Sequence, residues 1–259
     1  MRVKVLFVSG ILLFSYAECS AKRPHSAKKQ LKASKALNAR KPFTSKEYVD
    51  RGIYYMDEVD DNDLAIRDYT KAIALDPKNI MAYCKRAEAR LVNKEVYLAK
   101  QDIVQAEKIN PRSAQVFFTK AALADKLGDM NLCMENLKNV LEIDPNHEET
   151  HLIRSMKYFF KMNDRLKGIE ELESVIKTNP ESINAYHVRG TFFVMERDNE
   201  KALQCYYKSA DLAVAQKKKG KAQSALKRIK KLDPNSQRSR DLEKAIGNLP
   251  WLYGAIRKQ

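Results

Sequence analysis

Large and small side chains recur along this chain at intervals of 34 or 35 residues. Four prolines close segments that read ALDP, KINP, EIDP and KTNP, and they are Pro77, Pro111, Pro145 and Pro180. A large residue recurs five times at nearly the same interval: Tyr48, Tyr83, Phe117, His151 and Tyr186. Self-similarity at a fixed period of this length is typical of stacked supersecondary units. The pattern therefore predicts five repeats over residues 45–214.

Small residues keep register with these large ones. A first small series follows the large one by four residues: Gly52, Ala87, Ala121, Ser155 and Gly190. Two further series lie seven residues apart: Ala65, Ala99, Cys133, Gly168 and Ala202, then Ala72, Ala106, Val140, Val175 and Ser209. A bulky residue stands between these two series: Tyr69, Ile103, Leu137, Leu172 and Tyr206. Antiparallel helices need small side chains where their axes cross and bulky ones around the crossing. Each unit should therefore contain two helices, A and B, and the proline after helix B prevents its continuation.

This arrangement resembles the tetratricopeptide repeat, whose unit of 34 residues ends in a proline of this kind. The five units are residues 45–79, 80–113, 114–147, 148–181 and 182–214. The resemblance implies an all-α fold, a right-handed superhelical solenoid of antiparallel helix pairs. The departures are Cys133, Val140 and Val175 at small positions and the missing proline after the fifth unit.

Units one and four each hold one extra residue, which we place in the turns DEVDDND and KMNDR between helices A and B. After the fifth unit, helix B should run on to about Lys219, where Gly220 stops it. Residues 215–248 are then expected to form a helical cap with a polar outer face, followed by a tail at 249–259.

The first 21 residues have the features of a signal peptide. Arg2 and Lys4 precede a 13-residue apolar run, and small residues follow it. The expectation is export, to the periplasm or outside the cell. Lys22 and Arg23 follow the apolar run closely and oppose translocation, so an uncleaved membrane tether or an organelle lumen remains an alternative. No membrane span is expected in the mature chain.

The formal net charge of +15 is concentrated in two strips. Residues 22–44 should form a basic flexible arm, and the strip Lys22–Lys46 could touch an anionic surface. The second strip, Lys217–Lys231, is interpreted as a solvated face of the cap. Neither strip has interleaved aromatic residues, so nucleic-acid binding is disfavoured. The three cysteines outside the predicted leader, Cys84, Cys133 and Cys205, are widely spaced. We expect them to be buried helix thiols.

The resemblance implies a concave groove lined by the A helices that holds a partner protein or peptide. Transferring the register residue by residue gives the following predicted groove residues: Val49, Ile53, Met56, Cys84, Glu88, Leu91, Phe118, Ala122, Leu152, Met156, Phe159, His187, Thr191 and Val194. The first-turn positions of the same face are Lys46, Met81, Gln115, Glu149 and Asn184. This groove is apolar and lacks the Lys, Arg and Asn that some relatives use to clamp a carboxylate.

One motif matches a zinc protease pattern. Residues 147–151 read HEETH, in which two histidines could bind zinc and Glu148 could activate water. However, His147 follows the DPN turn, and His151 occupies the large position of the repeat. The repeat therefore accounts for the motif without a metal. The sequence predicts a scaffold without catalytic activity, metal or cofactor; the alternative is a structural subunit that binds through its convex face or basic arm.

Overall fold

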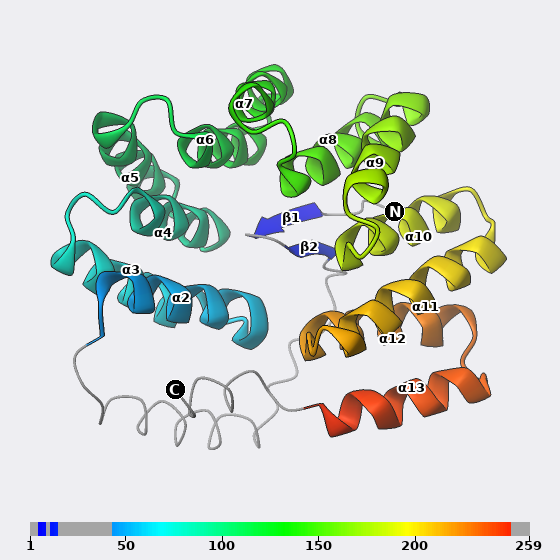
Figure 1. Ribbon diagram of the computed structural model, residues 1–259. Coiled ribbons are helices and arrows are strands. Elements are labelled where there is room, and N and C mark those ends of the chain that lie inside the picture. The colour runs from blue at the N-terminus through cyan, green and yellow to red at the C-terminus, as the bar shows by residue number, and fades with distance from the viewer. Residues whose placement is uncertain (1–4, 9–10, 15–42, 250–259) are drawn as a thin grey trace. The chain divides into compact units, whose positions relative to one another are not determined.

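The computed structural model describes residues 5–8, 11–14 and 43–249 of the chain (Figure 1). After Ile143 the chain divides into two compact units, each a series of helix pairs. The first unit contains α2 (Ser45–Tyr54), the π-helical turn η1 (Tyr55–Val59), α3 (Asn62–Leu75), α4 (Ile80–Val92), α5 (Val96–Ile109), α6 (Ala114–Leu127) and α7 (Met130–Ile143). The second contains α8 (Glu148–Phe160), α9 (Arg165–Thr178), α10 (Ile183–Met195), α11 (Asn199–Ala215), α12 (Lys219–Leu232) and α13 (Gln237–Asn248).

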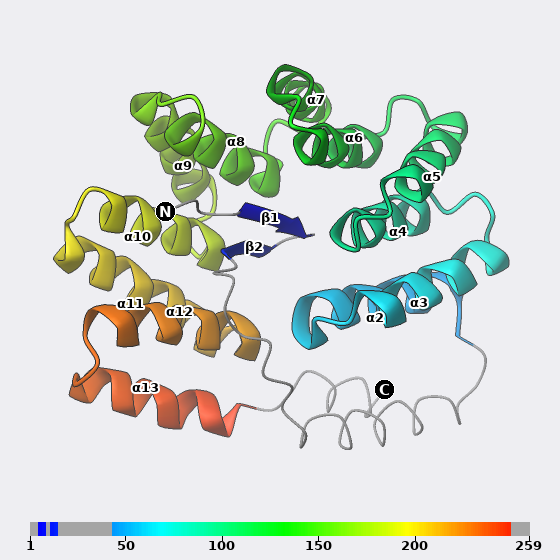
Figure 2. The same cartoon turned by 180° about the vertical axis from the view of Figure 1, so that it is seen from behind.

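Each A helix packs against its own B helix, as both views show (Figure 1 and Figure 2). In the first compact unit the A helix α4 also contacts the A helices α2 and α6. In the second compact unit α8 contacts α10. The predicted class of consecutive antiparallel helix pairs is confirmed.

The B helices end where the prolines require. Asp76, Asn110 and Asn179 each stand just before a repeat proline and form the C-cap of a B helix. Their side chains accept hydrogen bonds from the backbone N–H two residues later, at 3.0–3.2 Å. Such Asx turns turn the chain sharply into the next A helix.

The turns between helices A and B have a register of their own. One residue in each adopts the left-handed conformation: Asp60, Lys94, Gly128, Asn163 and Arg197, with φ between 54° and 82°. At Lys94, Gly128 and Arg197 the next N–H reaches back five residues to a helix carbonyl, which closes the helix as a Schellman motif. These left-handed residues recur every 34 or 35 positions and fix the angle at which helix B begins.

The extra residue of units one and four widens the end of helix A. In unit one it produces η1, and the N–H of Asp61 bonds to the carbonyl of Tyr55 across six residues. In unit four the N–H of Asp164 reaches Tyr158 in the same way. The insertion lies before the left-handed residue, so it is absorbed as a wide helical turn as well as a longer loop.

The predicted stop at Gly220 is wrong. Helix α11 ends at Ala215, because Lys217 is left-handed and the N–H of Lys218 closes a Schellman motif on the carbonyl of Ala213. Gly220 instead lies in the first turn of α12. Helix α11 packs against both α10 and α12, so it belongs to two successive helix pairs.

The core follows the alternation of small and large residues. Tyr69, Leu137, Leu172 and Tyr206 are at most 1% exposed. The departures at small positions are accommodated: Cys133, Val140 and Val175 are also buried. The three thiols Cys84, Cys133 and Cys205 are buried, as predicted.

Most of the predicted signal peptide, the basic arm up to residue 42 and the tail from residue 250 lie outside the described residues. Within the predicted leader, β1 (Val5–Val8) and β2 (Ile11–Phe14) pair as antiparallel strands with Val5 opposite Phe14. Of the helices in the described residues, none is both long enough and apolar enough to span a bilayer.

Candidate interaction surface

Most of the predicted groove residues are buried. Ten of the fourteen have less than 9% of their surface exposed: Val49, Met56, Cys84, Glu88, Leu91, Phe118, Leu152, Met156, Phe159 and Thr191. The other four are half-buried: Ile53, Ala122, His187 and Val194. The role of all fourteen in partner binding stays a prediction, and a partner could reach only small parts of most of them.

Contacts between successive repeats explain this burial. Cys84 packs with Ala106 and Val116. The ring of Phe159 stacks on that of Phe192 with centroids 3.9 Å apart. Because neighbouring A helices touch, residues on their shared flank fill the joint between repeats.

Glu88 is held in a buried polar cluster that joins α4 to α6. Its carboxylate accepts hydrogen bonds from Lys85 Nζ at 2.9 Å, from Gln115 Nε2 at 3.0 Å and from Thr119 Oγ1 at 3.3 Å. A buried carboxylate needs such partners to offset its lost hydration. The predicted groove residue therefore holds two repeats together.

The first turn of each A helix is where this face reaches the surface. The equivalent residues Lys46, Met81, Gln115, Glu149 and Asn184 are exposed or half-buried in all five repeats. Their chemistry differs from repeat to repeat, whereas the core positions keep their size. This line of first-turn positions is the accessible part of the predicted surface in each unit.

Ion pairs between helices A and B were missed in the sequence. The guanidinium of Arg51 binds both carboxylate oxygens of buried Asp68, with Nη2 to Oδ1 at 2.7 Å. Arg86 binds Asp102 in the same way. In unit four Arg154 Nη2 lies 2.7 Å from Glu171 Oε1. A signal was available, because a basic residue follows the large position by three in every repeat: Arg51, Arg86, Lys120, Arg154 and Arg189.

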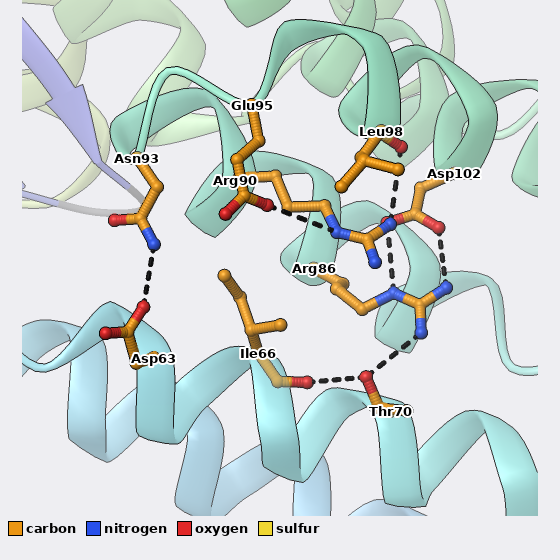
Figure 3. A network of polar contacts seen from close by, with 9 residues as sticks. All are labelled: Asp63, Ile66, Thr70, Arg86, Arg90, Asn93, Glu95, Leu98 and Asp102. Atoms are coloured by element: carbon orange, nitrogen blue, oxygen red, sulfur yellow. Dashed lines mark hydrogen bonds and ion pairs between the residues drawn. The ribbon is translucent and has the colours of Figure 1, made fainter.

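Asp102 is the centre of the largest of these networks (Figure 3). The carboxylate is 2% exposed. It accepts from Arg86 Nη2 and from Arg90 Nη1, both at 2.6 Å. Arg86 also donates to Thr70 Oγ1 at 3.1 Å, so the network connects α3, α4 and α5. Three charge-assisted bonds to one buried acid fix the angle between these helices.

The HEETH motif serves the local structure of unit four. His147 is the N-cap of α8, and its Nδ1 accepts from the N–H of Thr150 at 3.2 Å. Glu148 accepts from Ser182 Oγ at 2.7 Å. His151 Nδ1 lies 2.6 Å from Glu171, and its Nε2 lies 2.9 Å from the carbonyl of Pro145. Within the described part of the chain, no three His, Cys, Asp or Glu side chains could together hold a metal ion.

In the second compact unit, the pKa of one histidine is raised and the pKa of another is lowered. The hydrogen bond to Glu171 raises the pKa of His151 above its ordinary value. Burial lowers the pKa of His187 to about 4, and the charge of Arg228 adds to this effect. His187 packs beside the Tyr206 ring, with centroids 5.2 Å apart.

The exposed apolar side chains lie mainly on the B helices. Tyr97 on α5 is 72% exposed, and Leu166, its equivalent two repeats later on α9, is 76% exposed. Val104 lies two turns after Tyr97 on α5 and is also exposed. The surface opposite the predicted groove therefore offers more apolar area.

Comparison with known proteins is consistent with the helix pairs. Tetratricopeptide repeat family models match residues 114–147 and 204–236. The first match coincides with the third predicted unit. The second joins α11 to α12 and so differs from the predicted unit 182–214.

The curated human protein DnaJ homolog subfamily C member 3 is 29% identical over 142 residues, which cover 47% of this chain. The match spans only 28% of that relative's length. Among solved structures, TTC0263, a thermophilic tetratricopeptide repeat protein of Thermus thermophilus, is similar with a TM-score of 0.56 and 14% identity, covering 78% of this chain and 99% of that one.

The type IV pilus biogenesis factor PilW gives a TM-score of 0.51 and 19% identity, covering 77% of this chain and 98% of that one. At these identities the likeness shows the fold. Two segments of the chain thus match the tetratricopeptide repeat, and its helix pairs have the fold of solved tetratricopeptide repeat proteins.

Proposed function

We propose that the chain is a scaffold without catalytic activity that holds a partner polypeptide on the A-helix side of its repeats. The observation that supports this is the line of first-turn positions, since the same position reaches the surface in every repeat with different chemistry. A solenoid presents such positions as an extended surface, which suits a peptide or helix that contacts several repeats.

The chemistry of the described polar groups supports a role without catalysis. Among the ionisable side chains inside the helix pairs, Asp68 and Asp102 form ion pairs and Glu88 joins two repeats, and these roles are structural. Export and the contact of Lys22–Lys46 with an anionic surface remain predictions from the sequence. Most of the residues on which they depend lie outside the part of the chain that the structure describes.

A second candidate has its own observation. The exposed Tyr97 and Val104, two turns apart on α5, favour a structural subunit that docks through its B helices, because exposed apolar patches often mark protein interfaces. The two candidates differ in the face that binds.

One experiment separates them. The tagged chain is cross-linked in its native cells, its partner is identified, and the purified pair is measured by calorimetry. We expect the variant Met81→Glu/Gln115→Glu to weaken binding at least tenfold. Tyr97→Glu/Val104→Glu, which adds the same charge to the opposite face, should bind like the wild type.

The reverse result would favour docking through the B helices. If both variants stay helical by circular dichroism and neither loses affinity, neither face binds the partner. Because Gln115 also donates to Glu88, a Met81→Glu single variant repeats the A-face test without that bond.

A further inference from the structure

The described positive charge is concentrated at the last two helices. Residues 216–249 contain eleven Lys or Arg and three Asp or Glu, a net charge of +8. Residues 43–215 have a net charge of −4 by the same count. The repeats are thus nearly balanced, and the C-terminal helices are strongly basic.

Helix α12 separates its apolar and basic residues onto opposite faces. Ala222, Ala225, Leu226 and Ile229 are buried against α11 and α13. Four basic residues lie outside this apolar face, and we call them the α12 basic face: Lys221, Lys227, Arg228 and Lys231. Lys227 and Lys231 are exposed, and Lys221 and Arg228 are half-buried. The face extends about 15 Å along the helix at a rise of about 1.5 Å per residue.

The charge pattern in the first turn of α12 does not favour its stability, whereas Lys230 and Lys231 in the last turn suit the helix dipole. The helix has no acidic residue, and Lys219 and Lys221 lie in its first turn, where the helix dipole favours negative charge. Its N-cap, Lys218, makes no side-chain capping bond, whereas Asp164 and Asp198 cap α9 and α11. Lys227 and Lys231 are four residues apart and repel each other. Local rules broken in this way are expected at functional positions.

Some basic residues here have structural roles and do not belong to the face. Lys219 Nζ donates to the carbonyls of Gly247 and Leu249 at 3.2 and 2.8 Å, which caps α13. Lys230 pairs with Glu243 at 2.7 Å. The charge of Arg228 also acts on His187 of α10, so the exposed part of the α12 basic face is Lys227 and Lys231.

We propose that the α12 basic face docks an acidic polypeptide segment. Charge complementarity is the argument for the occupant, and the spacing of the basic residues matches acids three, four and seven apart on a partner helix. Helices α12 and α13 contain no aromatic residue on which a base could stack, so a single-stranded nucleic acid is a poorer match. The apolar face of α12 is buried, so the helix cannot insert into a lipid surface. None of its four residues is a first-turn position of the A helices α2, α4, α6, α8 and α10.

The test uses the full chain with fluorescein-labelled poly-L-glutamate as the probe, followed by fluorescence anisotropy. We expect Lys227→Glu/Lys231→Glu to weaken binding at least tenfold. Lys100→Glu/Lys177→Glu changes two exposed lysines of α5 and α9 by the same charge and should weaken it less than threefold. Carbodiimide cross-linking with mass spectrometry should join the probe to Lys227 or Lys231 in the wild type. The neutral pair Lys227→Gln/Lys231→Gln, checked by circular dichroism, replaces the reversal variant if that one fails to fold.

Equal weakening by both reversal variants, or cross-links confined to residues 22–42, would overturn the proposal. The same measurements with oligo(dT) and with phosphatidylglycerol vesicles decide the class of partner. Tighter binding of either one than of polyglutamate, with loss in the α12 variant, would replace the acidic polypeptide by a nucleic acid or a membrane.

Discussion

The ring of Tyr69 lies directly over the Cα of Gly52. A Cβ at position 52 would come within 2.8 Å of Tyr69 Cζ and 2.9 Å of Cδ1, and closer still to Cε1. Gly190 and Tyr206 repeat this relationship in unit five, where the Cβ would lie 2.8 Å from the ring. Repeats with Ala or Ser at the small position have Ile or Leu opposite. The close approach of helices A and B therefore limits the combined size of the small residue and the bulky residue that face each other.

Replacing Gly52 by Ala should destabilise the chain. Tyr69 is fully buried and cannot move aside, so the added methyl group overpacks the joint at a cost of about 1–3 kcal/mol. The free energy of unfolding is measured by urea denaturation. Gly247→Ala is the matched control, because nothing lies within 4 Å of its Cβ, and it should stabilise α13 by up to about 1 kcal/mol. A Gly52→Ala/Tyr69→Leu double variant should recover part of the loss; equal stability of both Ala variants would contradict this packing.

Removing the charge of Asp102 should strongly destabilise the first compact unit, which ends at Ile143. Asp102→Asn leaves the guanidinium groups of Arg86 and Arg90 partly buried without their acid, and loss of one buried partner costs about 3–5 kcal/mol. Thermal melting monitored by circular dichroism reports the change. Asp50→Asn breaks the exposed pair with Lys46 and should change stability by less than about 1 kcal/mol. The network has no stabilising role if both variants melt together.

The second compact unit should lose stability as the pH rises through the raised pKa of His151. Its folded-state pKa is raised above the ordinary 6.5, so the interaction with Glu171 is fully present below that pH and is lost as pH rises through the raised value. His151→Gln should therefore reduce stability more at pH 5.5 than at pH 8.5, as measured by urea denaturation. Glu171→Gln should remove the same pH dependence. A constant difference between wild type and His151→Gln at both pH values would refute the assignment.

His187 should have the opposite effect. Its folded-state pKa is lowered to about 4, so the unfolded chain binds the proton first and stability falls as pH decreases from about 6.5 towards 4. His187→Phe places the residue of the equivalent position in unit three, Phe118, at this site. We expect the variant to keep the stability that the wild type loses between pH 6.5 and 4.5. Thermal melts over this range test it, and parallel curves would show that His187 titrates normally.

The helix pairs could be predicted from the sequence because packing between helices A and B imposes residue size at fixed positions. Gly52 opposite Tyr69 is visible as a pattern, since each repeat solves the same local problem. The prolines and the Asx residues before them mark the ends of helix B for the same reason. The stop at Gly220 failed because Lys217 adopts the left-handed conformation despite its side chain, and the sequence does not show this.

The burial of the predicted groove residues could not be read from the register. The register identifies which face of an A helix a residue occupies, but it does not show what the next A helix covers. Phe159 lies on the predicted face and nevertheless stacks on Phe192. Glu88 is also predicted to line the groove, and it bonds to Gln115 and Thr119 of the following repeat. Burial of this kind depends on contacts between repeats, which a single repeat does not encode.

The wide turns at the ends of α2 and α8 are spaced by more than a single repeat. Their left-handed residues, Asp60 and Asn163, are three repeats apart, and the boundary between the two compact units falls after Ile143, between the third and fourth repeats. Both insertions thus occur in the first repeat of a block of three. The first helix pair of each compact unit therefore contains a wide turn, and the other helix pairs of the described repeats do not.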